Sequence, residues 1–209
     1  RMGLAPVRAH GRLSFGSSSA LKIVALSATV GIRREARLAV ADIDRGYYGG
    51  HALTIACHPS ETGERMMVRV LAFALHADDA LAFGRGLSSE DEPDLARRDP
   101  TGAIDLWIDV GLPDERELRK ACGRAREVHV YAYGGRACAL WWEKAGSALA
   151  RQPSLVVHEV PQEASRALAE LAARTMKLQC TIQDGHVFVS DGERSVGVEL
   201  RTLKAAGAA

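Results

Sequence analysis

The chain has 209 residues, of which 47% are hydrophobic and 25% are charged. This is the composition of a soluble globular protein, and it excludes a disordered chain or a coiled coil. The 27 Lys and Arg residues against 26 Asp and Glu residues leave a net charge of +1. A dedicated nucleic-acid binder of strongly basic composition is therefore excluded, and any such binding has to use a local patch.

The four cysteines contain no CxxC pair, so the sequence excludes a zinc ribbon and a disulfide framework. Free cysteines favour a reducing compartment, and we expect a cytoplasmic protein. The most apolar early stretch, residues 21–30, has about half the length that a membrane span needs and carries Lys22. We therefore expect no association with a membrane.

Residues 1–26 differ from the rest of the chain, because the first acidic residue is Glu35. No small-residue cleavage site follows a clean apolar stretch here, so we expect an extraneous or disordered extension rather than a targeting peptide. Residues 27–204 are expected to form a single domain, and residues 205–209 a flexible tail.

The hydrophobic pattern predicts the first elements in chain order. Apolar residues at even positions predict a strand over residues 29–40, and a second strand follows over 51–57. Helical spacing then predicts a helix from residue 59 to 77. The turn at 99–102 joins a short strand at 94–98 to a strand that starts at residue 103, which together predict a hairpin.

The second half of the chain is also predicted to contain both helices and strands. Asp114 can cap a helix whose apolar stripe contains Leu118 and Ala121. A hairpin is predicted from strands at 128–133 and 136–142, followed by a strand at 154–160 and a helix at 164–176. Three last strands are separated by two Asp-Gly turns. The uneven alternation predicts an α/β fold in which helices flank a mixed β-sheet.

The densest group of chemically useful residues is acidic. In the strand that starts at residue 104, the side chains of Asp105, Trp107 and Asp109 share one face. If the turn pairs Arg98 with the residue at 103, Asp94 lies opposite Trp107 and three carboxylates converge. Such a cluster is stabilised by a divalent cation, and hard oxygen ligands suit Mg²⁺ or Mn²⁺. The alternative is that these acids form the solvent face of the strand.

A further acid, Glu64, lies on the apolar stripe of the predicted helix at 59–77, where a carboxylate needs a partner. Glu61 lies at the flank of this stripe near the helix start, and a favourable interaction with the helix dipole is enough to explain it. Glu64 is therefore the preferred fourth ligand.

Several separate motifs follow one another along the chain: His58-Pro-Ser-Glu-Thr, Glu64-Arg-Met-Met, Asp91-Glu-Pro, Ile104-Asp-Leu-Trp-Ile, Leu112-Pro-Asp-Glu, Trp141-Trp142, Arg174-Thr-Met and Gln179-Cys-Thr-Ile-Gln-Asp-Gly. Together they resemble the bacterial YaeQ family. The resemblance covers about residue 27 to the last strand. It implies a variant of the restriction-endonuclease-like PD-(D/E)XK fold, whose site hydrolyses phosphodiesters with a metal ion.

Carried onto this chain, the resemblance places the PD element at Pro93-Asp94, the (D/E)XK element at Asp109–Gly111 and the acid of the first helix at Glu64. The lysine of the motif is replaced by Gly111. Lys120 could substitute, although the helical wheel turns it towards solvent, and Arg119 is an equal alternative. The predicted catalytic residues are thus Asp94, Asp109, Lys120 and Glu64, and the predicted metal ligands are Asp94, Asp105, Asp109 and Glu64.

Two functions follow as expectations: a metal-dependent nuclease, or a catalytically inactive module of the same fold that binds nucleic acid or a protein. Basic residues on and near the helix after Asp114 could contact a phosphate backbone. They are Arg116, Arg119, Lys120, Arg124 and Arg126. Interleaved glutamates make a solvated helix face the alternative interpretation.

Overall fold

The computed structural model describes residues 32–84 and 92–207. Contacts between residues divide the chain into two units, Arg1–Val30 and Gly31–Ala209. All described residues belong to the second unit, so the predicted extension at 1–26 lies outside them. No helix in the described part of the chain is long and apolar enough to cross a membrane.

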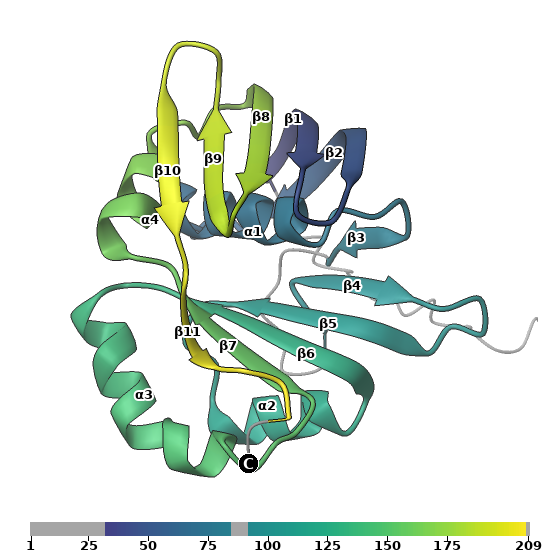
Figure 1. Cartoon of the computed structure of the whole chain (residues 1–209), viewed down its shortest axis with the longest axis vertical. Helices are drawn as coiled ribbons and strands as arrows, with labels where there is room; N and C mark the ends of the chain where they lie inside the picture. Colours follow the sequence, from purple (N-terminus) through teal and green to yellow (C-terminus); the bar gives the residue numbers. More distant parts are fainter. Residues whose placement is uncertain (1–31, 85–91, 208–209) are drawn as a thin grey trace, which may run out of the picture. The chain divides into compact units, whose positions relative to one another are not determined.

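The unit Gly31–Ala209 contains two β-sheets (Figure 1). The first has the strand order β10-β9-β8-β1-β2, and its strands are β1 (Ile32–Asp42), β2 (Tyr47–Cys57), β8 (Thr175–Gln183), β9 (His186–Ser190) and β10 (Ser195–Glu199). The second has the order β11-β7-β6-β5-β4-β3, with β3 (Leu81–Phe83), β4 (Leu95–Arg98), β5 (Ile104–Val110), β6 (Ala125–Ala132), β7 (Leu155–Glu159) and β11 (Arg201–Lys204). Both sheets mix parallel and antiparallel pairs.

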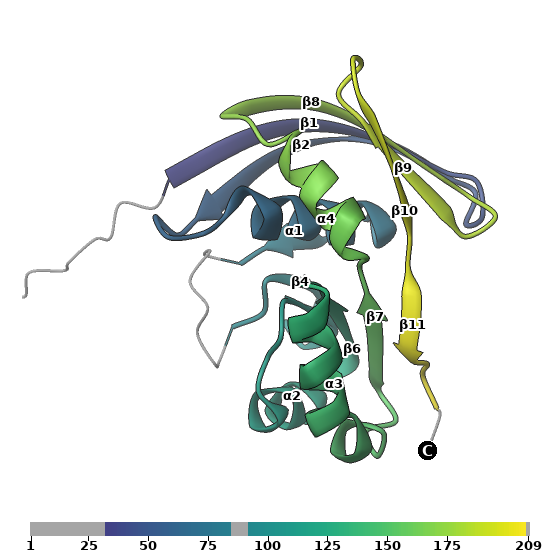
Figure 2. The same ribbon diagram turned by 90° about the vertical axis from the view of Figure 1, so that its left-hand side faces the viewer.

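Four described helices complete the fold: α1 (Gly63–Leu75), α2 (Glu115–Cys122), α3 (Arg136–Leu149) and α4 (Gln162–Ala169). Helices α1 and α4 pack between the two sheets, and α2 and α3 cover the opposite face of the second sheet (Figure 2). Apolar residues therefore form two cores, one on each side of the second sheet. The predicted α/β class is confirmed, with two mixed sheets in place of one.

Helix α1 is the buried centre of the unit. All residues from Met66 to Ala74 are buried, and all of them except Arg69 are apolar, as expected for a helix covered by two layers. Thr62 caps its start by accepting a hydrogen bond from the Arg65 backbone amide. The helix thus begins four residues later than the sequence pattern predicted. The cap of α2 was predicted correctly, because Asp114 and Glu117 form a capping box.

The predicted hairpin at 128–133 and 136–142 is wrong. Residues 136–149 form helix α3, which connects the parallel strands β6 and β7. Gly134 and Gly135 both have positive φ, so they turn the chain into a helix rather than into a two-residue hairpin. A crossover helix is the usual connection between parallel neighbours. The helix predicted at 164–176 ends at Ala169, and strand β8 starts at Thr175.

The register of the β4–β5 hairpin also differs from the prediction. Arg98 pairs with Ile104, and a bulge at Asp105 then brings Ala96 opposite Trp107 and Leu95 opposite Ile108. Continuing this register by one residue places Asp94 beside Asp109 rather than beside Trp107. A bulge turns the residues before it to a different face from those that follow, and this displaces Asp105 from the group.

Candidate functional site

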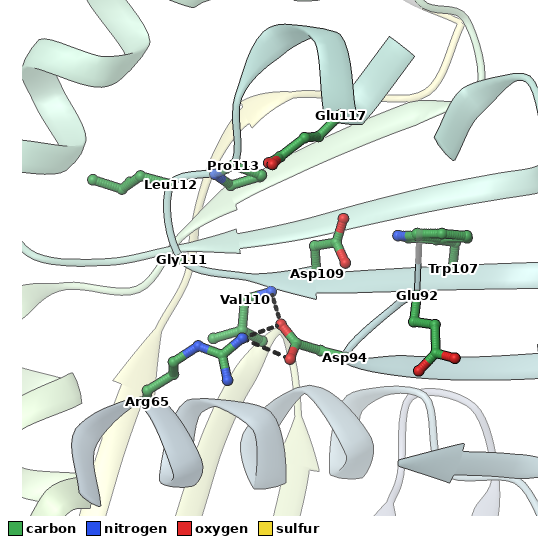
Figure 3. Close-up of a pocket in the computed structure, with 10 residues that line it drawn as sticks. All are labelled: Arg65, Glu92, Asp94, Trp107, Asp109, Val110, Gly111, Leu112, Pro113 and Glu117. Carbon is green, nitrogen blue, oxygen red and sulfur yellow. Dashed lines mark hydrogen bonds and ion pairs between the residues drawn. The ribbon is translucent and has the colours of Figure 1, made fainter. Parts of the chain in front are cut away.

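A cavity of about 320 Å³ lies at the carboxyl end of β5, where the chain leaves the second sheet towards α2 (Figure 3). Its described lining combines four carboxylates, one guanidinium, an indole and the β5–α2 connection. The lining residues are Arg65, Glu92, Asp94, Trp107, Asp109, Val110, Gly111, Leu112, Pro113 and Glu117. Two of the predicted metal ligands, Asp94 and Asp109, therefore reach the same hollow from neighbouring strand ends.

The Asp94 carboxylate is held from two sides. Arg65 Nη2 donates to both of its oxygens, at 2.7 and 2.8 Å, and the Val110 backbone amide donates to Oδ2 at 2.8 Å. The guanidinium reaches Asp94 from α1, as Figure 3 shows. These charge-assisted hydrogen bonds fix the orientation of the carboxylate. A carboxylate has about four acceptor positions, so Asp94 retains capacity for a further ligand.

A buried ion network stands behind Asp94. The Glu61 side chain is only 2% exposed, and it binds Arg65 at 2.8 Å and Arg69 at 3.1 Å. The fully buried Arg69 also donates to the Ala56 carbonyl at 3.0 Å, and its Nε lies 3.6 Å from Asp94 Oδ1. Two arginines thus compensate two carboxylates that are largely removed from water. Helix α1 places Arg65 and Arg69 on one side by their four-residue spacing, and Glu61, just before the Thr62 cap, lies on the same side.

Asp109 lies in a different environment from Asp94. Burial raises the pKa of Asp109 to about 7, and the negative charge of Asp94 acts in the same direction. The Trp107 indole lowers this pKa by a smaller amount, and its buried Nε1 has no hydrogen bond of normal geometry. Asp109 therefore changes its charge near neutral pH, whereas a solvated aspartate is ionised there.

The other sequence-predicted residues lie outside the cavity lining. Asp105 pairs with Arg97 at 3.2 Å and with Arg126 at 3.3 Å. Glu64 accepts a hydrogen bond of 2.6 Å from the Ser165 hydroxyl of α4. Lys120 is half-buried on α2 and does not contribute to the lining. The structure thus brings Asp94 and Asp109 together and keeps Asp105, Glu64 and Lys120 apart from them.

Sequence reasoning missed four lining or supporting residues. Glu92 and Glu117 supply carboxylates to the cavity, Arg65 supplies its cation, and Glu61 fixes Arg65. The signal for the last two was present, because Glu61 and Arg65 are four residues apart and Arg69 lies one turn further on the apolar stripe. A buried arginine at such a position indicates a buried acid nearby.

A divalent cation is compatible with part of the predicted ligand set. Among residues 32–84 and 92–207, no three His, Cys, Asp or Glu side chains lie close enough to hold a metal ion between them. The four-carboxylate cage expected from the sequence is therefore not assembled. Mg²⁺, however, is commonly held by one or two carboxylates, with waters and substrate phosphates as the remaining ligands. Asp94 and Asp109 are the residues that fit this arrangement.

Comparisons with known proteins agree with one another. The family model described as YaeQ protein matches residues 24–200. The YaeQ protein of Salmonella typhi is 46% identical over 177 residues, which cover 85% of this chain and 96% of the relative. The YaeQ protein of Escherichia coli strain K12 is 44% identical over the same coverage.

Two solved structures have the same fold. The YaeQ protein from Xanthomonas axonopodis pv. citri has a TM-score of 0.81 and 52% sequence identity, and the match covers 84% of this chain and 99% of that one. The YaeQ protein from Pseudomonas syringae has a TM-score of 0.80 and 36% identity, covering 84% and 97%. The resemblance stated from the sequence motifs is thereby confirmed, and the chain belongs to the YaeQ family.

Proposed function

We propose that the cavity is the active site of a hydrolase that cleaves phosphodiesters with a divalent cation, Mg²⁺ or Mn²⁺. The observation that carries the proposal is the meeting of Asp94 and Asp109 in one solvent-accessible cavity from adjacent strand ends. In the restriction-endonuclease-like variant implied by the family resemblance, these are the two acids of the PD-(D/E)XK pattern. The helix α1, the hairpin β4–β5 and the helix α2 surround them in the corresponding order.

Electrostatics explains why the site requires a cation. Four carboxylates and one guanidinium line the described part of the cavity, so its formal net charge is negative whether or not Asp109 carries a proton. Such a site repels a phosphate group. A bound divalent cation would supply a nucleophile by lowering the pKa of its water, and would neutralise charge on the phosphate.

The residues of the chain then have distinct roles. Asp94 and Asp109 are the proposed ligands, and Asp109 loses its proton when a cation is bound. Arg65 is the basic residue of the described lining, and its guanidinium can donate to a phosphate oxygen from the side of α1. Arg65 therefore replaces Lys120 and Arg119 as our candidate for the missing lysine of the motif. The free cysteines fit action in the cytoplasm.

A cleavage assay tests the proposal. Fluorescent single-stranded and duplex oligonucleotides are incubated with the protein and either Mn²⁺, Mg²⁺ or EDTA. We expect cleavage only with the cation, and a loss of at least about 100-fold in Asp109→Asn. Asp105→Asn is the matched control, because it alters the same residue type on the same strand away from the cavity. Equal activity of Asp109→Asn and the wild-type protein contradicts the proposal.

The second candidate is a catalytically inactive module of the same fold that binds nucleic acid or a protein. Two observations favour it: Gly111 occupies the place of the motif lysine, and Arg65 already binds both oxygens of Asp94. Thermal unfolding discriminates the two candidates. A cation bound only by the folded state raises the melting temperature, and this increase should be absent in Asp109→Asn if the site is a hydrolase. An inactive module shows no increase at millimolar Mn²⁺.

A further inference from the structure

The outer face of the first sheet is the face that points away from α1. Along β1, β2 and β8, buried residues such as Leu38, Val40 and Leu178 pack against the core, and the alternate residues point outwards. We define the outer face by the outward residues Arg37, Ala39, Tyr48, Gly50, Ala52, Lys177, Gln179, Thr181 and Phe188. This surface belongs to no part of the cavity described above.

Two cations lie side by side at the centre of the outer face. Arg37 on β1 is the register partner of Lys177 on the parallel strand β8. Both are exposed, and neither side chain forms a hydrogen bond or ion pair within the described residues. Like charges on directly paired residues are destabilising in a sheet. An anion between them would remove the repulsion.

The acidic groups near this pair do not neutralise it. Glu35 lies one row further along β1 and forms no ion pair with Arg37 or Lys177 among the described residues. Asp191, in the turn between β9 and β10, is already paired with Arg194 at 2.9 Å. The centre of the face therefore keeps a positive charge.

Exposed aromatic side chains occupy the second row beyond the cations, the row of Ala41 on β1. Tyr48 is 69% exposed and Phe188 is 48% exposed, which is high for aromatic rings on strands. Cross-strand pairs place them in one row: Tyr48 opposite Ala41, Ala41 opposite Thr181, and Thr181 opposite Phe188. With about 4.8 Å between neighbouring strands, the row spans roughly 14 Å. Two ring faces are thus presented on the same surface as the two cations.

The surface between these groups is hollowed. Small residues flank the cations: Ala52 on the edge strand β2 is the register partner of Arg37, and Ala39 and Gly50 form the next row. Together with the two cations they line an open groove of about 710 Å³. Asp191 and Gly192 line the same groove; they belong to the β9–β10 hairpin, whose tip rises above the sheet in Figure 2. A second groove of about 480 Å³ shares Arg37, Ala52 and Lys177 with the first. An extended ligand can therefore lie along the sheet.

We propose that the outer face binds single-stranded nucleic acid. Arg37 and Lys177 contact backbone phosphates, and unstacked bases pack on Tyr48 and Phe188. Open β-sheets that display aromatic and basic side chains suit this ligand, since every base has a π-face and the backbone has regular negative charge. A duplex, whose bases are already stacked, cannot use the aromatic rings. Binding of the strand to this face does not depend on a cation or on hydrolysis at the cavity of Asp94 and Asp109.

The N-terminal segment of this chain is a poor occupant by charge. Residues 1–31 contain four Lys or Arg residues and no acidic residue, so the segment has the same sign as the Arg37–Lys177 pair. A second copy of the same face would also bring like charges together. A polyanion is the complementary partner, and the rings select one whose bases are unpaired.

Fluorescence anisotropy with a labelled 20-nucleotide oligothymidine tests this proposal. EDTA is present, so that cleavage at the cavity cannot affect the result. We expect binding that weakens with added NaCl. In Arg37→Ser/Lys177→Ser, the slope of log affinity against log salt should fall by about 1.4, since each phosphate contact on a single strand contributes about 0.7. Tyr48→Ala and Phe188→Ala should each weaken binding at least about fivefold.

A matched control separates this face from the basic helix α2. Arg116→Ser/Arg126→Ser removes two positive charges from the region of α2 and should leave the affinity within twofold of the wild-type value. All four outer-face positions are exposed on strands, and equal melting temperatures verify folding of each variant. The proposal is overturned if the oligothymidine does not bind, if the α2 variant alone loses affinity, or if a hairpin duplex binds equally well and ignores Tyr48 and Phe188. The cleavage assay tests the cavity independently, so failure of the binding proposal can be distinguished from failure of the proposed hydrolase.

Discussion

The two faces of the second sheet carry titratable groups in opposite settings. On one face, Asp109 of β5 lies beside Trp107 in a cavity that solvent can reach. On the other, His129 of β6 and His158 of β7 pack against the end of α1, where His76 lies. Burial shifts the pKa of Asp109, His76 and His158 towards the neutral form of each group. Among the described residues of these two faces, only the acid face has a cavity that also contains a second carboxylate, Asp94. Neutral Asp109 can lose its proton if the proposed cation binds, whereas burial favours the neutral forms of His76 and His158.

The histidine face is held together by ring contacts and hydrogen bonds. His76 Nε2 and the Tyr131 hydroxyl are 2.7 Å apart, and the His76 and His129 rings meet edge to face at 4.4 Å. Burial lowers the pKa of His158 to about 4 and that of His76 well below its ordinary value, and neighbouring histidine charges add to both effects. Arg45 and Arg97 act on His76 in the same direction, while Glu127 pairs with His129.

The largest expected effect comes from breaking the ion network behind the acid face. Arg69→Met leaves Glu61 without one of its two cations and removes a neighbour of Asp94 in a fully buried position. Removal of one partner from a buried pair typically costs about 3–5 kcal/mol. Urea unfolding at pH 7 measures the loss, and Arg98→Met at an exposed position is the control, with less than about 0.5 kcal/mol expected. A loss of that small size in Arg69→Met would show that the network does not stabilise the fold.

The next effect is a loss of stability that Asp109 causes as the pH rises from acidic to neutral. The pKa of Asp109 is raised from 3.8 to about 7 by folding, so the folded state binds more protons than the unfolded state. Stability therefore decreases as pH rises from about 4 through 7, by up to about 4 kcal/mol. Asp109→Asn should remove this decrease and be more stable than the wild-type protein at pH 8. Chemical unfolding at pH 5 and pH 8 checks it, and Asp105→Asn should retain the decrease.

The histidine face should give a smaller change of stability with pH, in the opposite direction: stability is lost as the pH falls. Because folding lowers the pKa of His158 from 6.5 to about 4, the unfolded state binds more protons, and stability is lost as pH falls through this range, by about 3 kcal/mol. His158→Phe keeps a ring in the stack and should reduce the loss of stability at acidic pH. His76 should still contribute to the remaining loss. Melting temperatures at pH 7 and pH 4.5 measure it. If His158→Phe loses as much stability between pH 7 and pH 4.5 as the exposed control His186→Phe, His158 is not the cause of the loss.

Much of this fold was predicted from short sequence patterns, because turns, helix caps and the alternation of apolar residues depend on neighbouring residues in the chain. Alternation predicted β5 and the strands after the Asp-Gly turns, and the Asp114 cap predicted α2. The helix at 136–149 was missed, because Gly134-Gly135 suits both a hairpin and the start of a crossover helix. Only the parallel pairing of β6 with β7, a contact distant in sequence, decides between them.

The site was predicted in part for a similar reason. Asp94 and Asp109 were correctly expected to lie close together, but the bulge at Asp105 changes the face of the residues that follow it. No pattern in the sequence reveals a one-residue bulge. Glu64 was preferred over Glu61 because a helical wheel shows which residues face inwards but not which layer each meets. In the structure, Glu64 meets Ser165 and Glu61 meets the arginines.

Proton release on Mn²⁺ binding tests the central claim most directly. Isothermal titration in buffers of different ionisation enthalpy counts the protons released for each bound cation. With a pKa of about 7 for Asp109, we predict release of about 0.9 proton at pH 6 and close to none at pH 8.5, with Asp109→Asn showing no release. Binding without proton release at pH 6, or release that persists in Asp109→Asn, would contradict the assignment of Asp94 and Asp109 as the cation site.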